Sequence, residues 1–307
     1  MNIHDWALIT FTILTQMSVG AIWVLGIAHY LANRKYGMEE ADRLSDRALI
    51  GLVPVIILAF IASLFHLGDP FNAYRAVTNL GSSWLSREIF FGVLFAGLAV
   101  VFAFMQWRKI GSFGLRNLVA WLAALAGLAL VLSEAMVYYS LPAQPAWDSW
   151  NTPVSFFVTT FLLGALAVGA AFVANYAYLK GKTRANEEAQ SKLLGESLRW
   201  IAVAAIVLLG VELVLLPLYL GTLAIGTQAG LASVQMMTGP LGLALFLRLA
   251  LVFLGAGVFA VFLYQNALSA GQEKVLGILA YAAFVMVFVA EVLGRFLFYA
   301  AHVRIGI

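Results

Sequence analysis

The 307-residue chain is 63% hydrophobic and 11% charged, with a formal net charge of +3 and no cysteine. Soluble globular domains contain roughly 45–50% apolar and about 25% charged residues, so this composition excludes a soluble domain and indicates an integral membrane protein. Without cysteine, the chain holds no disulfide, no thiolate metal site and no iron–sulfur cluster of its own.

Apolar runs of about 20 residues predict membrane-spanning helices, because a helix of that length crosses the hydrocarbon core with its backbone hydrogen bonds satisfied internally. Eight such runs predict an all-α bundle of eight transmembrane helices, in a single domain that covers residues 1–307. The expected spans are about 5–32, 48–68, 87–107, 117–139, 153–180, 198–226, 241–267 and 275–300. The first run is too long for a cleaved signal peptide, and we interpret it as a retained span.

Basic residues gather in alternate loops. Loops 33–47, 108–116 and 180–199 carry most of the Lys and Arg residues, whereas loops 69–86, 140–152 and 227–240 carry few. The positive-inside rule places the basic loops in the cytoplasm. We therefore expect both termini to face the periplasm, with the chain in the bacterial cytoplasmic (inner) membrane. Loop 140–152, which holds two tryptophans, either rests on the lipid headgroups or docks a partner.

Charged side chains remain inside the predicted spans or at their ends. They are Glu88, Glu134, Glu212, Glu291, Arg248 and Arg295. An ionised group at mid-bilayer costs roughly 2.5–3.5 kcal/mol on insertion scales, so such residues are functional candidates by default. Nearly all of them fall in the periplasmic half of the predicted spans. This distribution predicts a site on one side of the membrane rather than a path across it.

These charges also have structural interpretations. Glu291 and Arg295 are spaced i, i+4 and are predicted to pair on one helix face, either as a structural pair or as a proton relay. Glu212, in an otherwise apolar stretch, fits a protonated core carboxyl. Arg248 either touches a ligand or pairs with Glu134.

The stretch FIASLFHLGDP (60–70) ends an apolar helix with polar and helix-stopping residues. A lone histidine on an apolar helix is usually a satisfied core residue. The glycine, aspartate and proline that follow His66 instead predict a ring at the mouth of a cleft, where it can bind a ligand and exchange protons near neutral pH. Such a cleft suits a quinol, with His66 as a hydrogen-bond partner and Glu88 or Asp69 as the carboxylate at the water edge. The candidates for its aromatic walls are Phe65, Phe71, Tyr74 and Trp84, and a plain interfacial belt of aromatic residues is the alternative interpretation of these side chains.

The four histidines make a haem site a poor fit. His29 falls at the cytoplasmic end of the first span, whereas the other three histidines are expected on the periplasmic side. His66 and His302 both fall near the membrane interface. Buried bis-histidine haem in a helix bundle usually has ligands well inside.

Several motifs resemble the membrane-anchor subunit of bacterial dimethyl sulfoxide reductases. They are FIASLFHLGDPFNAY (60–74), LGSSWLSREI (80–89), the C-terminal AEVLGRFLFYAAHVRIG (290–306) and, more loosely, WDSWNTPVSFF (147–157). The resemblance implies a three-subunit molybdenum oxidoreductase. In it, an anchor without redox cofactors of its own exchanges electrons between menaquinol and an iron–sulfur subunit docked outside, which connects to a molybdopterin catalytic subunit.

The resemblance also implies site residues: the quinol-site histidine is His66 and the nearby carboxylate is Glu88. The arginine expected two positions after the proline of the HLGxP motif is Asn72 here, and Arg75 lies nearly one helical turn later. This departure leaves the quinone type and the direction of electron flow open. The expected quinol-binding residues are His66, Gly68, Asp69, Asn72, Tyr74, Arg75 and Arg248.

We therefore expect a quinol-oxidising anchor that is the quinone-reactive subunit of an oxidoreductase and does not act on the terminal substrate itself. One alternative is the same anchor role with electrons flowing in the opposite direction, so that the subunit reduces a quinone, as in sulfite-oxidising enzymes. From another class, the alternative is a proton-coupled secondary transporter, although the paired broken helices typical of such transporters are not evident. A passive scaffold would leave His66 and Arg248 unexplained.

Overall fold

The computed structural model describes residues 3–65, 78–180, 187–269 and 271–306, and every regular element among them is helical. The elements are α1 (Ile3–Tyr36), α2 (Met38–Leu64), α3 (Trp84–Arg108), α4 (Phe113–Tyr139), α5 (Asn151–Leu179), α6 (Glu187–Gly226), α7 (Gln228–Thr238), α8 (Gly242–Val252), the π-helical η2 (Phe253–Phe259), α9 (Ala260–Asn266) and α10 (Glu273–Ala300). Within the described residues, eight helical segments are long and apolar enough to cross a membrane, which confirms the predicted number of spans and the all-helical fold class; α8, η2 and α9 form one of these segments.

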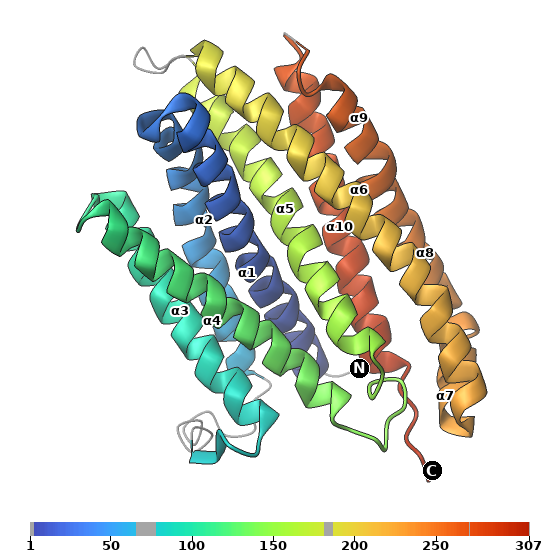
Figure 1. Cartoon of the computed structure of the whole chain (residues 1–307). Helices are drawn as coiled ribbons and strands as arrows, with labels where there is room; N and C mark the ends of the chain where they lie inside the picture. Colours follow the sequence, from blue (N-terminus) through green and yellow to red (C-terminus); the bar gives the residue numbers. More distant parts are fainter. Residues whose placement is uncertain (1–2, 66–77, 181–186, 270, 307) are drawn as a thin grey trace.

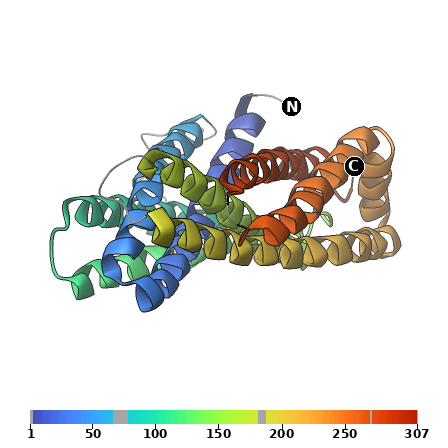
Figure 2. The same cartoon turned by 90° about the horizontal axis from the view of Figure 1, so that it is seen from above.

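The spanning helices run side by side, and both termini lie at the same end of the bundle (Figure 1). We call this the termini end, and the other the opposite end. Helices α1 and α5 occupy the middle, α3 and α4 lie on one flank, and α6 and α8 lie on the other (Figure 1). Figure 2 shows that the bundle is elongated in cross-section. The side of the membrane that the termini end faces stays a prediction.

The central helices touch through glycine. A Cβ added at Gly164 of α5 would lie 2.3 Å from the carbonyl carbon of Gly20 on α1, and one at Gly20 would lie 1.9 Å from the carbonyl oxygen of Thr160. Small residues let membrane helices approach closely, because association in lipid depends on van der Waals packing rather than on burial from water. This crossing holds the neighbouring turns of α1 and α5, which carry site residues, at a defined distance.

The polar loops expected beside the first, second and sixth spans are largely helical. Gly37, with φ of 87°, separates α1 from α2, and α6 begins at Glu187 rather than near residue 198. Charged residues at i, i+4 sustain these extensions, such as Lys192 with Glu188 at 2.7 Å. A short helix, α7, also forms in the predicted loop 227–240.

Replacing Gly164 with Val tests the helix crossing. The new side chain would overlap the backbone of α1, which cannot rotate away, so we expect the free energy of unfolding to fall by about 3 kcal/mol. Tryptophan fluorescence during thermal unfolding in detergent measures this. Gly97→Val on α3 is the control, because a Cβ there meets nothing within 4 Å. Equal melting temperatures for the two variants would contradict the close approach.

Candidate functional site

Most of the predicted quinol-binding residues lie outside the residues that the structure describes. These are His66, Gly68, Asp69, Asn72, Tyr74 and Arg75. The described chain stops at Phe65, whose carbonyl oxygen accepts a 2.8 Å hydrogen bond from Nδ1 of His4. It resumes at Thr78, shortly before α3 begins. Both flanks of the predicted segment therefore lie at the termini end, and His4 is a titratable neighbour that the sequence pattern did not single out.

The first turns of α3 place Arg87 and Glu88 in different surroundings. Ser83 caps the helix by accepting a hydrogen bond from the Ser86 backbone N–H. Arg87 stacks over Trp84, with its guanidinium carbon 4.1 Å from the ring centroid, and donates to two carbonyl oxygens of the preceding loop. Glu88 is instead buried, at 8% exposure, and no described residue donates a hydrogen bond to it. This carboxyl is therefore a buried acid at the start of α3.

A second carboxyl, Glu134 of α4, lies near Glu88. It is 1% exposed, and the two carboxyls are close enough to interact electrostatically. Its oxygens accept hydrogen bonds from Thr15 Oγ1 at 2.8 Å and from Gln16 Nε2 at 3.0 Å. On the other side of the same amide, Arg295 Nη2 donates to Gln16 Oε1 at 2.9 Å. One neutral side chain of α1 therefore connects an acid of α4 to a base of α10.

Aromatic rings enclose the Arg295 guanidinium. Its central carbon lies 3.7 Å from the ring centroid of Phe156 and 5.5 Å from that of Phe298. The hydroxyls of Tyr138 and Tyr299 are 2.9 Å apart, and the Tyr138 ring packs edge-on against Phe298. A cation over aromatic faces gains more when it is desolvated, so this cage stabilises the buried charge.

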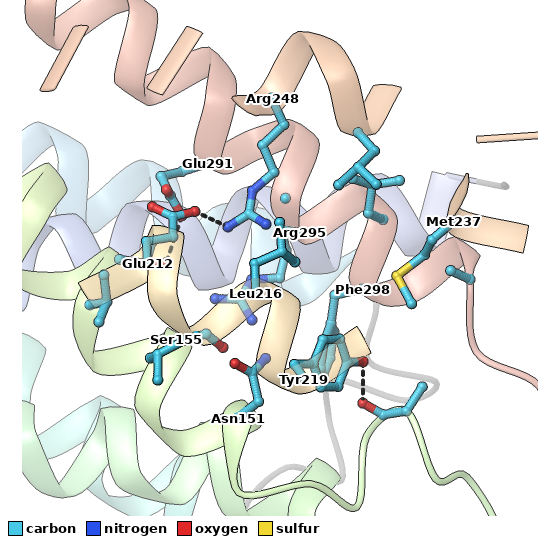
Figure 3. A pocket seen from close by; sticks show the side chains of 18 residues that line it. Asn151, Ser155, Glu212, Leu216, Tyr219, Met237, Arg248, Glu291, Arg295 and Phe298 are labelled. Carbon is cyan, nitrogen blue, oxygen red and sulfur yellow. Dashed lines mark hydrogen bonds and ion pairs between the residues drawn. The ribbon is translucent and has the colours of Figure 1, made fainter. Parts of the chain in front are cut away.

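A second group of charges faces a cavity of about 80 Å³ formed mainly by α5, α6, α8 and α10 (Figure 3). Arg248 Nη2 forms an ion pair with Glu212 of α6. Glu291 Oε2 accepts a 2.6 Å hydrogen bond from Thr159 Oγ1. The Arg248 side chain crosses α10 at Gly294, where an added Cβ would lie 2.5 Å from Nε. A glycine is therefore required for the arginine to reach its partner.

Four buried polar atoms around this cavity have no hydrogen-bond partner within the described part of the chain. They are Glu212 Oε2, Arg248 Nε, Glu291 Oε1 and Arg295 Nε. Leaving such an atom unpaired costs about 1–3 kcal/mol. A water takes about 30 Å³ in the liquid, so this polar cavity is large enough for water to satisfy these groups.

The two groups of charges meet at Arg295, which lines the cavity and also bonds to Gln16. Together they form what we call the polar layer: Thr15, Gln16, Glu88, Glu134, Thr159, Glu212, Arg248, Glu291 and Arg295. It crosses the bundle from α3 to α6 in the half nearer the termini end. Its carboxyls can take up and release protons. Among the described residues no His, Asp or Glu cluster suits a metal ion.

Glu291 and Arg295 do not form the ion pair that their i, i+4 spacing predicts. Glu291 turns toward Thr159 and the cavity, whereas Arg295 turns toward Gln16 and Phe156. Because contacts to neighbouring helices satisfy each side chain separately, the shared helix face does not bring them together.

The partners of Arg248 also differ from the prediction. Arg248 pairs with Glu212, not with Glu134. The reason is topological: α8 packs against α10, and Glu134 is satisfied by α1 on the other side of the bundle. Glu212 is a buried carboxyl, as expected, and it also has an ion-pair partner.

Sequence reasoning missed the neutral members of the site. Thr15, Gln16 and Thr159 each hydrogen-bond a buried carboxylate, and Tyr138 and Tyr299 bond to each other. Polar side chains in membrane spans commonly hydrogen-bond across helices. A glutamine in the middle of an apolar run is a signal of this kind.

Loop 140–152 packs onto the end of α10 instead of merely resting at the lipid surface. Trp147 stacks on Phe298 and donates its Nε1–H to the Phe298 carbonyl oxygen at 2.7 Å. His302 stacks on the same indole at 4.2 Å, while Trp150 remains exposed. His29 lies far from this loop, at the opposite end of the bundle, where it bonds to an aspartate.

Comparison with known proteins shows similarity along the whole chain. The family model described as DMSO reductase anchor subunit (DmsC) matches residues 1–301. The chain is 28% identical over 307 residues to one chain of the anaerobic dimethyl sulfoxide reductase of Escherichia coli K12, an alignment that covers 99% of this chain and 96% of the relative. It is 31% identical over 171 residues to the anaerobic dimethyl sulfoxide reductase chain YnfH of the same organism, covering 54% of this chain and 57% of the relative. It is 29% identical over 183 residues to a sulfite dehydrogenase subunit of Allochromatium vinosum, covering 56% of this chain and 54% of the relative.

Replacing Gln16 with Leu tests the bridge in the polar layer. The change leaves Glu134 and Arg295 each without one buried partner, so we expect the free energy of unfolding to fall by about 1–3 kcal/mol. Thermal unfolding in detergent measures this. Thr10→Val on the exposed face of α1 is the control, because its hydroxyl donates to the Trp6 carbonyl of its own helix. A Gln16→Leu variant as stable as this control would contradict the bridging role.

A double-mutant cycle tests the contact between Gly294 and Arg248. Gly294→Ala should displace the guanidinium from Glu212 and cost about 1–3 kcal/mol in the wild-type background. In an Arg248→Ala background there is nothing to displace, so the same change should cost close to zero. Equal costs in the two backgrounds would show that the glycine is needed for some other reason.

Proposed function

The chain belongs to the DMSO reductase anchor subunit family, and we propose that it oxidises a quinol, menaquinol being the expected one, near the periplasmic face of the membrane. In this proposal it is the quinone-reactive subunit of a heterotrimeric molybdopterin oxidoreductase. The electrons pass to an iron–sulfur subunit docked on the periplasmic side, and from there to the molybdopterin subunit that acts on the terminal substrate.

The observation that carries the proposal is the buried carboxyl of Glu88. It lies at the termini end, directly after the segment that contains His66, and no described residue satisfies it. A quinol hydroxyl is a suitable donor for such a carboxyl. A buried carboxyl is costly unless a hydrogen-bond or ion-pair partner stabilises it, and in this proposal the quinol provides such a partner.

The chemistry divides between two kinds of group. Oxidation of a quinol releases two electrons and two protons, and the quinone leaves. His66 accepts one proton and the Glu88–Glu134 pair the other, and both are passed to water on the same side of the membrane. A neighbouring carboxyl favours sharing a single proton between the two, because like charges this close do not both ionise readily.

Arg248, expected among the quinol-binding residues, is better suited to a supporting role. Its cavity of about 80 Å³ is well below the roughly 300–1,000 Å³ of sites that bind drug-sized ligands. Its guanidinium is already paired with Glu212. We therefore propose that the quinol ring lies on the Glu88 side of the polar layer, and that the Arg248 side is hydrated.

The alternative direction, quinone reduction, has one specific observation in its favour. The relative named as a sulfite dehydrogenase subunit matches 56% of this chain. The same site would serve both directions, because the protons and electrons retrace the same groups. The potential of the partner subunit would set the direction.

The transporter alternative is weaker. The polar layer is confined to the half of the bundle nearer the termini end, and the charges at the opposite end form separate pairs, such as Asp42 with Lys109 and Lys35 with Glu196. A proton or ion crossing the membrane would need polar groups at intermediate depths as well.

Two substitutions test the proposed site in membranes that hold the assembled complex. His66→Arg should abolish binding of a fluorescent quinol-site inhibitor while the complex still assembles. Glu88→Gln should lower the quinol oxidation rate at least about 100-fold, because a positioned base contributes factors of this size. Measuring electron transfer from quinol to the terminal acceptor and the reverse reaction also distinguishes the two directions.

The matched control is Glu39→Gln, an exposed carboxyl at the opposite end. It should leave inhibitor binding and turnover unchanged. If His66→Arg and Glu88→Gln behave like this control, the quinol site lies elsewhere. If Arg248→Ala alone abolishes inhibitor binding, the site moves to the cavity beside Glu212.

A further inference from the structure

A larger cavity lies at the opposite end of the bundle, away from the polar layer. Its volume is about 360 Å³, and it is formed by α1, α2, α3 and α4. This volume falls within the range of pockets that hold drug-sized ligands. Nothing in the proposed quinol chemistry uses it, because Glu88 and Glu134 belong to the other half of the bundle.

The deep part of the cavity has apolar and rigid walls. Trp23 donates its Nε1–H to the Ala124 carbonyl oxygen at 3.1 Å, and its ring meets Trp121 edge-on with centroids 5.6 Å apart. Phe102 and Leu49 complete this part of the wall. The indole rings are held in place by these contacts, so the cavity is preformed.

The cavity opens to the lipid-facing surface of the bundle. Three of its lining residues are more than half exposed: Ile27 at 55%, Trp121 at 57% and Tyr30 at 58%. Large apolar and aromatic side chains exposed on a membrane helix face the bilayer. An occupant therefore enters sideways from the membrane and does not have to cross a packed core.

The shallow part of the cavity carries one unsatisfied positive group. The Nε of Arg116, in the first turn of α4, is buried and has no hydrogen-bond partner within the described part of the chain. No Asp or Glu is among the described residues that line the cavity. An anion at Arg116 would supply the missing partner.

Several charged and polar groups beside the cavity are already engaged. His29 bonds to Asp42 at 3.0 Å, and Gln106 bonds to Asp42 and Asp46 at 2.8 and 2.9 Å. Lys109 binds both aspartates, at 2.8 and 2.7 Å. These contacts occupy Asp42 and Asp46, and no described acid forms an ion pair with Arg116, so its guanidinium is available to an occupant.

The polar and apolar parts are spaced as a membrane amphiphile requires. Arg116 and Ala124 stand on the same helix, α4, and at about 1.5 Å per residue they are roughly 12 Å apart along its axis. The cation is at the helix end, where headgroups lie, and the indole walls are one to two turns deeper, where acyl chains lie.

We propose that this cavity holds one phospholipid, with its phosphodiester on the Arg116 guanidinium and one acyl chain along Trp23 and Trp121. Arginine suits this role because its planar guanidinium binds phosphate oxygens in a bidentate manner. The neutral oxygens of a quinone would accept hydrogen bonds from Arg116 but would not neutralise its charge, whereas a phosphodiester does both. The bound lipid joins the α1–α2 pair to the α3–α4 pair at the end that the polar layer does not reach.

Native mass spectrometry of the purified complex tests the proposal. The wild type should retain one phospholipid per anchor subunit, and Arg116→Ala should lower retention at least about tenfold. Arg108→Ala is the matched control: this arginine lies at the same end, exposed beside Trp107, and does not line the cavity. It should retain lipid like the wild type. Equal retention in Arg116→Ala would overturn the proposal.

A second variant changes the apolar part of the cavity. Ala120→Phe would fill the space beside Trp121 and should also displace the lipid, although it leaves Arg116 in place. Organic extraction followed by phosphorus analysis and quinone chromatography identifies the occupant. A retained quinone in place of phospholipid would overturn the assignment.

Adding phosphatidylglycerol to delipidated complex should raise the melting temperature of the wild type but not of Arg116→Ala. Inorganic phosphate at the same concentration should have no effect. Stabilisation by inorganic phosphate alone would reduce the site to an anion site and overturn the role of the acyl chain. Quinol turnover in both variants measures the function of the polar layer separately. Failure of the lipid proposal is therefore distinct from failure of the proposed quinol function.

Discussion

The polar layer depends on one amide. Gln16 donates to Glu134 and accepts from Arg295, so a neutral side chain of α1 separates and links two buried, opposite charges. Each charge alone would be costly to bury, and each is instead satisfied without a direct ion pair. The amide is held at this position because α1 crosses α5 through Gly20 and Gly164, one turn further along the helix. Backbone contact between two glycines thus determines where charges on α4 and α10 can meet.

The eight spans and the charged residues of the site were predictable, whereas the pairing of those residues was not. Long apolar runs have few alternatives to helices in lipid, and a charge within such a run stands out. The partners depend on helix packing between distant segments. Arg248 of α8 forms an ion pair with Glu212 of α6, and Glu134 of α4 accepts a hydrogen bond from Gln16 of α1. The i, i+4 rule describes one isolated helix, and it failed for Glu291 because Thr159 of α5 offered a better partner.

The predicted helix boundaries were wrong for a related reason. Polarity predicts loops over residues 33–47 and 180–199, but charged residues are good helix formers when they pair along one face. Arg43 with Glu39, and Lys192 with Glu188, show this at the opposite end of the bundle. Hydropathy marks where the chain leaves the membrane, and it does not mark where the helix ends.

The polar layer contains four carboxyls and two guanidiniums, at Glu88, Glu134, Glu212, Glu291, Arg248 and Arg295. If every carboxyl were ionised, the layer would carry a net charge of −2 in a medium that solvates charge poorly. Electroneutrality is reached when it holds about two protons. A layer that already holds them cannot store those taken from a quinol, so each proton that enters requires another to leave. The arrangement therefore suits passage of protons to water at one face of the membrane. It does not require a polar path through the apolar middle of the bundle.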